Sequence, residues 1–222
     1  MKQIATKKLF LSFFINLAIV VLEIIGLVLS VQRHGKNVFQ YFTENSNYFA
    51  LIVSVIFCIG CIFAVKNKTN VAHFICVLRY VSTVCLTVTI TVVLFVLIPM
   101  FPSTFLFMMF QTSNLYQHFL CPVLSIVSLL FLENQQKLYS SAIFYAIIPT
   151  LVYGTILISL NLLEIISGPY PFFYFYLVPW YVSVFGCLGV FLGSVLIAVL
   201  LFFVYNKPQQ SHSKKFVNQK NT

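Results

Sequence analysis

The chain has 222 residues, of which 60% are hydrophobic and 8% charged, and its formal net charge is +9. No water-soluble globular domain of this size has such a composition. Apolar runs of about 20 residues, long enough to cross the hydrocarbon core of a bilayer, recur along the chain. The sequence therefore predicts an all-α, polytopic transmembrane bundle and excludes large soluble catalytic folds such as a Rossmann or P-loop domain.

The positive charge does not predict nucleic-acid binding, because the lysines lie in short segments between apolar runs, where they contact anionic lipid headgroups. All six cysteines lie inside predicted spans, which favours packing over a disulfide framework. Cys58 and Cys61 have the spacing of a redox motif, but no βαβ pattern surrounds them. Membrane lipids are the expected partners, and neither a cofactor nor a metal site is expected.

Six spans are predicted, at 9–31, 48–65, 74–100, 116–132, 142–163 and 180–205. The first run is too long for the core of a signal peptide and has no small-residue cleavage site. Between the spans we expect a polar loop at 32–47, a stop at Pro99 and Pro102, a polar turn at 133–141 and an aromatic segment at 168–176. Residues 1–206 would form one transmembrane domain, and 207–222 a disordered basic cytoplasmic tail.

The distribution of Lys and Arg predicts the orientation. Arg33 and Lys36 lie on one side of the predicted spans. The other side collects ten lysines: Lys2, Lys7, Lys8, Lys66, Lys68, Lys137, Lys207, Lys214, Lys215 and Lys220. The positive-inside rule then places both termini in the cytoplasm and the protein in the plasma membrane.

With this orientation, polar groups from three distant parts of the chain meet at the outer face. The start of the second span carries Thr43, Glu44, Ser46 and Asn47. The start of the fourth carries Asn114 and His118, and the fifth is followed by Glu164 and the Pro169-Tyr170-Pro171 segment. We expect a functional site where these groups converge.

His118 is the centre of that expectation, since an ionisable residue inside a membrane span is a functional-site candidate. Pro122, four residues on, leaves the carbonyl of His118 without its helical partner and can bend or widen the helix. Thr43 and His118 could form a nucleophile–base pair. Alternatively, Thr43 is the N-cap of its span and His118 a structural hydrogen-bonding group between helices. Glu44 and Glu164 read most simply as solvated loop charges.

Two further polar features are predicted to lie deeper in the membrane than the groups at the outer face. Glu23 falls near the middle of the first span, where an unpaired carboxylate is costly. Four polar residues recur every four positions in the third span and form one stripe: Arg79, Thr83, Thr87 and Thr91. A Glu23–Arg79 pair is one reading, and snorkelling of Arg79 to the cytoplasmic surface is the other. The aromatic run 172–176 reads equally well as an interface anchor.

Four short motifs follow one another along the chain: Tyr41-Phe42-Thr43-x-x-Ser46-Asn47, Leu78-Arg79 before a Thr-rich span, His118-x-x-x-Pro122, and Tyr170-Pro171-Phe172. Together they resemble the androgen-induced-protein-like family of six-span membrane proteins, particularly its bacterial branch. The resemblance implies a threonine hydrolase that cleaves fatty acyl esters, with the Thr and His of that family at Thr43 and His118.

The leading hypothesis is therefore a lipid ester hydrolase with its site toward the outer leaflet. Thr43 would be the nucleophile, His118 the base, and Ser46, Asn47 or Asn114 an oxyanion donor, with Tyr170 in support. The alternatives are a binder or carrier of a small lipid or amphiphile, and a structural partner of another membrane protein. A carrier predicts a cavity reaching Glu23 and the Arg79 stripe. A structural partner predicts an exposed small-residue face at Gly186, Gly189 and Gly193.

Overall fold

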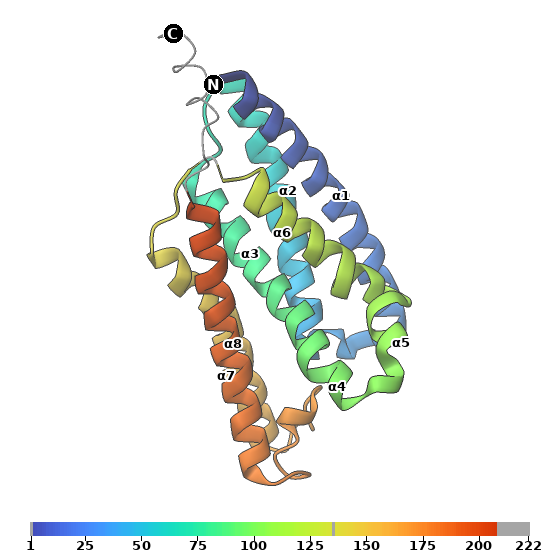
Figure 1. The fold of residues 1–222 in the computed structure, drawn as a ribbon. Helices are drawn as coiled ribbons and strands as arrows, with labels where there is room; N and C mark the ends of the chain where they lie inside the picture. The colour runs from blue at the N-terminus through green and yellow to red at the C-terminus, as the bar shows by residue number, and fades with distance from the viewer. Residues whose placement is uncertain (1, 135, 208–222) are drawn as a thin grey trace, which may run out of the picture.

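The computed structural model describes residues 2–134 and 136–207, with side chains from residue 7 onward, and the described part contains helices and no strand (Figure 1). The all-α prediction is confirmed. Five of the described helices are long and apolar enough to cross a membrane. A bent pair, Pro102–Phe110 with Leu115–Phe131, raises the number to six if it counts as one span. The predicted tail falls, from residue 208 on, outside the described residues.

The long helices are α1 (Lys2–His34), α2 (Phe42–Asn67), α3 (His73–Val92), α7 (Ser141–Leu162) and α8 (Trp180–Asn206). The π-helical segment η2 (Val93–Leu97) and the short α4 (Ile98–Met100) extend α3. The bent pair consists of η3 (Pro102–Thr104), α5 (Phe105–Phe110), the π-helical η4 (Leu115–Leu120) and α6 (Cys121–Phe131). Like η3, the two remaining short elements are 3-10 helices: η1 (Gly35–Gln40) and η5 (Pro171–Phe173).

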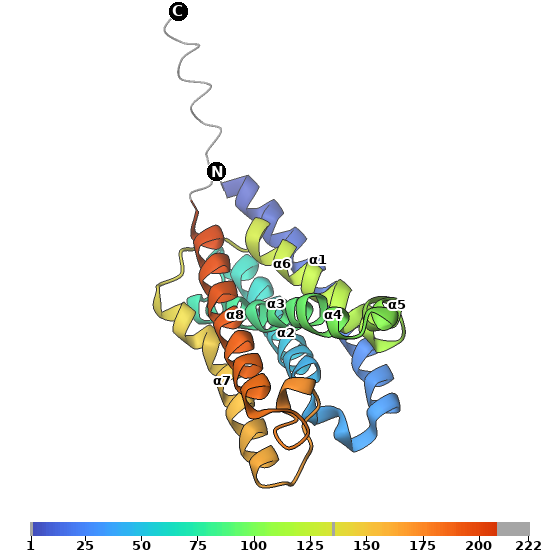
Figure 2. The same cartoon turned by 60° about the horizontal axis from the view of Figure 1, so that its bottom comes forward.

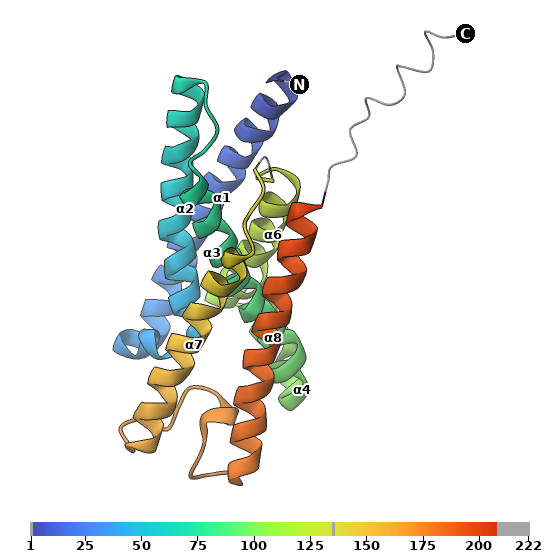
Figure 3. The same ribbon diagram turned by 90° about the vertical axis from the view of Figure 1, so that its left-hand side faces the viewer.

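Helix α3 lies at the centre of the bundle and contacts α2, α6, α7 and α8 (Figure 1). The pair α7 and α8 packs on one side of α3, and α2 and α6 pack on the other, where α1 covers them (Figure 1). Figure 3 shows the same bundle from the side of α7 and α8. Helix α1 begins and α8 ends at the same end of the bundle (Figure 1). We call the opposite end, which contains η1, α5 and η5, the distal end (Figure 2).

The predicted polar loop at 32–47 is wrong. Helix α1 runs to His34, η1 follows directly, and α2 begins at Phe42. The polar residues 43, 44, 46 and 47 therefore lie in the first turns of α2, and all four are buried. Side chains from other helices bond Glu44 and Ser46, and Asn47 donates to a carbonyl of its own helix. The polarity that predicts a loop in water here marks contacts inside the bundle.

Prolines coincide with the two π-helical segments. A proline ring cannot donate a backbone hydrogen bond and clashes with the carbonyl four residues earlier. For Pro99 that carbonyl belongs to Phe95 in η2, and for Pro122 it belongs to His118 in η4. The helix widens at His118, as the proline spacing predicts. The third span ends at Met100, between Pro99 and Pro102, as predicted.

Near the end of the bundle that holds the start of α1, Arg79 forms a buried ion pair with Glu133. Arg79 is 0% exposed, and its Nε and Nη2 lie 3.1 Å from Glu133 Oε2 and Oε1. The guanidinium also donates to Ser125 and lies over the Phe57 ring. Both sequence-based readings of Arg79 are therefore wrong: its partner is not Glu23, and the side chain does not snorkel. Glu133, expected in a polar turn, is buried too.

The ion pair is surrounded by further hydrogen bonds. Asn16 and Ser128 donate to Glu133 Oε1 at 2.9 and 2.6 Å, and the Tyr205 hydroxyl donates to the Glu133 carbonyl at 3.1 Å. Thr83 bonds Ser125 at 2.8 Å. The cluster therefore joins α1, α3, α6 and α8. Because hydrocarbon offers no replacement partner, each of these polar groups depends on the others.

We expect Glu133→Gln to lower the free energy of unfolding by roughly 3–5 kcal/mol, because it leaves the buried Arg79 charge uncompensated. The double variant Arg79→Met/Glu133→Leu should recover part of this loss, since it buries neither charge. The free energy of unfolding of each variant can be measured in mixed micelles by titration with a denaturing detergent, followed by circular dichroism. Equal losses in the two variants would contradict this account of the pair.

Candidate functional site

A cavity of about 250 Å³ opens at the distal end; we call it the distal cavity. It gathers residues from α1, α2, the bent pair and the 168–174 segment, which approach one another there (Figure 2). Its polar and ionisable lining residues are Arg33, His34, Tyr41, Thr43, Glu44, Asn114, His118, Tyr170 and Tyr174. Four of the sequence-predicted site residues, Thr43, Asn114, His118 and Tyr170, thus face one space.

His118 is held by a backbone hydrogen bond. Its Nδ1 lies 2.6 Å from the Met108 carbonyl oxygen, close to the end of α5. A carbonyl oxygen only accepts, so Nδ1 carries the proton and Nε2 keeps its lone pair. The bond runs across the bend of the same helix pair rather than to a neighbouring span, and it orients the ring. An imidazole fixed in this tautomer suits a general base.

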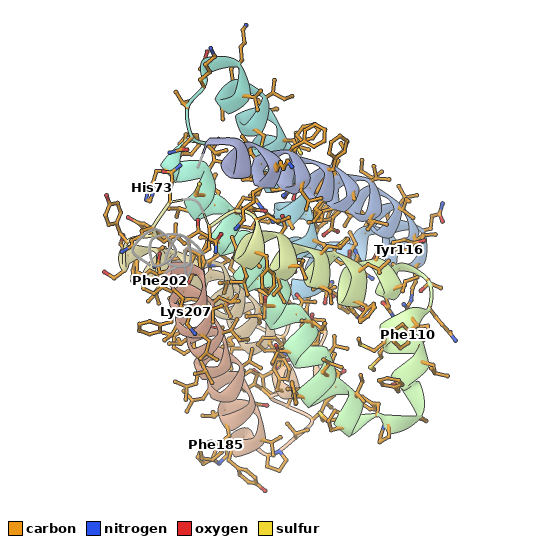
Figure 4. All side chains as sticks on the ribbon, turned by 45° about the horizontal axis from the view of Figure 1, so that its top comes forward. His73, Phe110, Tyr116, Phe185, Phe202 and Lys207 are labelled. Carbon is orange, nitrogen blue, oxygen red and sulfur yellow. The ribbon has the colours of Figure 1, made fainter. Side chains whose placement is uncertain are left out.

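The bent pair reaches its position because α1 allows close approach. A Cβ atom at Gly26 would lie 2.9 Å from Tyr116 Cβ and 3.2 Å from Gln117 Cγ, so any other residue would push η4 away. Figure 4 shows Tyr116 beside the distal part of α1. His118 follows two residues later, and its placement therefore depends on the glycine in α1.

Thr43 is not the N-cap of α2. The cap position is Tyr41, whose side chain makes no capping hydrogen bond, and Thr43 lies inside the first turn. Only 8% of Thr43 is exposed. Its side chain interacts instead with the hydroxyl of Tyr170, a residue far along the chain. The N-cap alternative for Thr43 is therefore wrong, and the residue is available for contacts within the bundle.

Tyr170 links the loop before α8 to the start of α2. Its hydroxyl oxygen accepts the Phe42 N–H at 3.1 Å. Burial raises the pKa of the Tyr170 phenol, and hydrogen bonds from Thr43 and Phe42 partly oppose that rise. The phenol therefore stays protonated at neutral pH. Since its oxygen already accepts the Phe42 amide, its own hydrogen can be donated, and Tyr170 is a candidate donor to a substrate oxygen.

Among the described residues no hydrogen bond joins Thr43 directly to His118. Both side chains line the distal cavity, where a water molecule or a substrate group can lie between them. Catalytic hydrogen bonds of this kind are often absent until substrate binds. The geometry brings the two residues to one space without pairing them.

Ser46 and Asn47 are engaged elsewhere. The Ser46 hydroxyl donates to the Thr43 carbonyl at 2.8 Å and contacts the Thr89 hydroxyl at 2.9 Å, and Asn47 Nδ2 donates to the same carbonyl at 2.7 Å. Neither residue lines the distal cavity, so the proposed oxyanion role does not suit them. Asn114 does line it, with one amide hydrogen given to the Phe107 carbonyl at 2.9 Å.

Glu44 is not a solvated loop charge. It is 4% exposed, and Ser30 and Gln117 donate to its two carboxyl oxygens, Gln117 at 2.6 Å. Glu164, in contrast, is exposed, as expected. Sequence reasoning overlooked Ser30, Gln117 and Arg33, which lines the distal cavity with its guanidinium 4.5 Å from the Phe107 ring centre. For Gln117 the sequence did contain an indication of such a role, because it is a polar residue inside an apolar run and next to His118.

The deeper polar residues are separate from this site. Glu23 is fully buried, and the Cys121 side chain lies beside its carboxyl group. Thr83 bonds Ser125 in the Arg79 cluster, and Thr87 donates to the Thr83 carbonyl at 2.7 Å. Neither Glu23 nor Arg79 lines the distal cavity.

A second space of about 290 Å³, which we call the apolar cavity, lies between α3, α7 and α8 and meets the start of α2. Aliphatic and aromatic side chains dominate its lining, including Phe42, Val92, Ile158 and Phe173. Thr43 and Tyr170 line both cavities. These two hydroxyl groups therefore stand at the boundary between a polar and an apolar space.

Comparison with protein-family models, curated proteins and solved structures finds no match to this chain. The resemblance read from the four motifs therefore stays a prediction. Within the described residues, no group of three or more His, Cys, Asp and Glu side chains could hold a metal ion. The case for function depends on the geometry of Thr43, His118 and Tyr170.

Tyr170→Phe should cost about 1–2 kcal/mol of unfolding free energy at neutral pH, because it leaves the Phe42 N–H without its acceptor. The pKa of a tyrosine in the unfolded chain is about 10, and folding raises the pKa of Tyr170 above that value. Below pH 10 the phenol is protonated in both states. As the pH rises above 10, the unfolded chain loses its proton first, so the folded state loses stability. The variant should therefore lose less stability than wild type above pH 10. Unfolding curves across pH 7–11 measure the difference, and parallel curves would exclude this role for Tyr170.

Proposed function

We propose that this protein is an ester hydrolase acting on fatty acyl lipids in the membrane. One observation carries the proposal: Thr43 and Tyr170 lie where the polar distal cavity, which contains His118, meets the apolar cavity. A lipid ester has the same division, with a polar ester group next to an apolar chain. A chain in the apolar cavity would bring its ester carbonyl to the Thr43 hydroxyl.

The residues have complementary roles in this reaction. Thr43 Oγ1 attacks the ester carbonyl carbon, and His118 Nε2 accepts the hydroxyl proton. The carbonyl oxygen becomes an oxyanion, to which the Tyr170 hydroxyl donates, with the free amide hydrogen of Asn114 as a second donor. The C–O bond to the alcohol then breaks, and His118 returns the proton to the departing oxygen. Water, deprotonated by His118, hydrolyses the acyl-threonine and releases the fatty acid.

The proposal includes an orientation in the plasma membrane with both termini in the cytoplasm. The exposed cations Lys66, Lys68, Lys137 and Lys207 lie at the end of the bundle opposite the distal cavity. The positive-inside rule places that end in the cytoplasm. The distal cavity would then face the outer leaflet, and the motif resemblance to the androgen-induced-protein-like family supports the same chemistry at the same two residues.

The alternative of a carrier has less support. It calls for a passage from the distal cavity to Glu23 and Arg79, and neither residue lines the distal or the apolar cavity. A structural partner calls for an exposed small-residue face on α8. Gly186 does not belong to such a face, because Phe172 packs against it; Gly189 and Gly193 are open. The hydrolase is therefore the function that the site geometry favours.

Purified protein should hydrolyse fluorogenic long-chain esters, and His118→Ala should lower kcat by about 10²–10⁴, the usual contribution of a general base. Thr43→Ala should abolish turnover, while Thr43→Ser, which keeps the hydroxyl, should retain a measurable fraction. Mass spectrometry after rapid quenching should find an acyl group on Thr43. Ser46→Ala serves as the control, because its hydroxyl lies outside the distal cavity.

Turnover that is indifferent to both Thr43→Ala and His118→Ala, with the melting temperatures of the variants unchanged, would exclude this mechanism. An absence of turnover across the whole ester panel would direct attention to lipid binding without cleavage.

A further inference from the structure

A third apolar space, of about 430 Å³, lies between α3 and α8 on the side of α8 that carries its glycines. We call it the α3–α8 groove. Helix α8 contributes Val182, Phe185, Gly186, Gly189, Val190, Gly193, Ser194 and Ile197, and the α3–α4 helix contributes residues from Val88 to Met100. Figure 4 shows Phe185 in the distal part of α8. The reaction proposed above makes no use of this groove.

The groove exists because α8 lacks side chains at two positions. A Cβ atom at Gly189 or Gly193 would meet no heavy atom within 4 Å. The two glycines are therefore not required by close packing against α3 within this chain. Glycine costs about 1 kcal/mol relative to alanine in a helix interior. Open glycines in a membrane helix leave room for something outside the chain.

The groove runs along helix α8. Its α8 lining runs from Val182 to Ile197, which at 1.5 Å per residue is a length of about 22 Å. One leaflet of the hydrocarbon core is about 15 Å deep. The groove is therefore longer than one leaflet is deep, so an extended acyl chain of the leaflet at the distal end can lie along it over its whole depth.

The groove also continues into the candidate site. It shares Val88, Val92, Phe172 and Val190 with the apolar cavity, and it shares Pro171 with the distal cavity. Phe172 stacks on Tyr170 with ring centres 5.3 Å apart, and its Cβ would lie only 2.6 Å from a Cβ at Gly186. Phe172 therefore forms the partition between the groove and the space next to Thr43 and Tyr170.

We propose that the α3–α8 groove binds one acyl chain of a bilayer lipid and delivers it, past Phe172, to the cavities that contain Thr43. The proposal commits to a lipid chain because the groove lies within the membrane-spanning part and meets the polar distal cavity at one end, and because its lining is apolar except for the hydroxyl residues Thr91 and Ser194. In the proposed hydrolase this is the route of substrate entry. Occupancy of the groove itself does not require cleavage.

The test uses protein in phosphatidylcholine nanodiscs that contain a phosphatidylcholine with a diazirine at the end of one acyl chain. After irradiation, peptide mass spectrometry compares labelling of the half-buried groove residues Val96 and Ile197 with labelling of the exposed, lipid-facing residues Leu200 and Phe203. We expect higher labelling in the groove. The variant Gly189→Leu/Gly193→Leu should reduce that labelling at least about tenfold, the factor for lost burial of roughly two methylenes.

The matched control is Leu192→Phe, which adds bulk to α8 at a residue that is exposed and lines none of the three spaces; its labelling should equal wild type. The glycine variant should melt no lower than wild type, since leucine is the better helix former. Equal labelling of groove and lipid face in wild type would overturn the proposal. Unchanged labelling in the glycine variant would also overturn it. If the glycine variant instead changed from a dimer to a monomer, the groove would belong to contacts with a second copy of α8.

The hydrolase proposal and the groove proposal fail in different ways. Labelling is read in the Thr43→Ala variant as well, for which the hydrolase proposal expects no turnover. A labelled groove in a protein that cleaves no ester would leave the groove assignment intact and remove only the hydrolase. Ester cleavage without groove labelling would leave the hydrolase proposal intact and remove only the groove assignment.

Discussion

The buried Arg79–Glu133 pair is the constraint on which the rest of the bundle depends. Moving two charges out of water is costly, and only close geometry with additional hydrogen bonds offsets that cost. The chain supplies these bonds from Asn16, Ser128 and Tyr205. Their helices must therefore meet at one point, which fixes α1, α6 and α8 around α3. Apolar contacts alone specify such positions poorly, because lipid chains are as apolar as the helix surfaces.

A second polar cluster, at the distal end, fixes the site. Glu44 on α2 accepts from Ser30 on α1 and Gln117 on η4, so three parts of the chain are tied together next to the cavity. His118 is the neighbour of Gln117 in the widened helix before Pro122. π-helical segments often coincide with functional sites, because the extra residue changes the direction of the side chains. Here the widening and the bend place His118 against the Met108 carbonyl and toward the cavity.

The spaces around Thr43 give the proposed chemistry its physical setting. The polar side offers Arg33, His118 and Asn114, and the apolar side offers aliphatic and aromatic surface. Tyr170, a predicted site residue, is 8% exposed, and Phe172, which the sequence also allowed as an interface anchor, is 7% exposed; their rings separate these spaces. An aromatic partition suits this position, because its ring faces are apolar while the tyrosine hydroxyl supplies one hydrogen bond. The proposed path of the lipid and the proposed chemistry then meet in one short segment.

The sequence alone determined the class of the protein and the approximate extent of its helices, because hydropathy over about 20 residues is a local property. It also singled out Pro122 as the cause of the widened helix, since proline acts on its own backbone. Partners in space were not predictable in this way. Glu133 was assigned to a polar turn and Glu44 to water, because their partners Arg79 and Gln117 are far away in the chain. Only the tertiary structure decided which polar groups meet, because a bilayer leaves each of them no partner except another part of the same bundle.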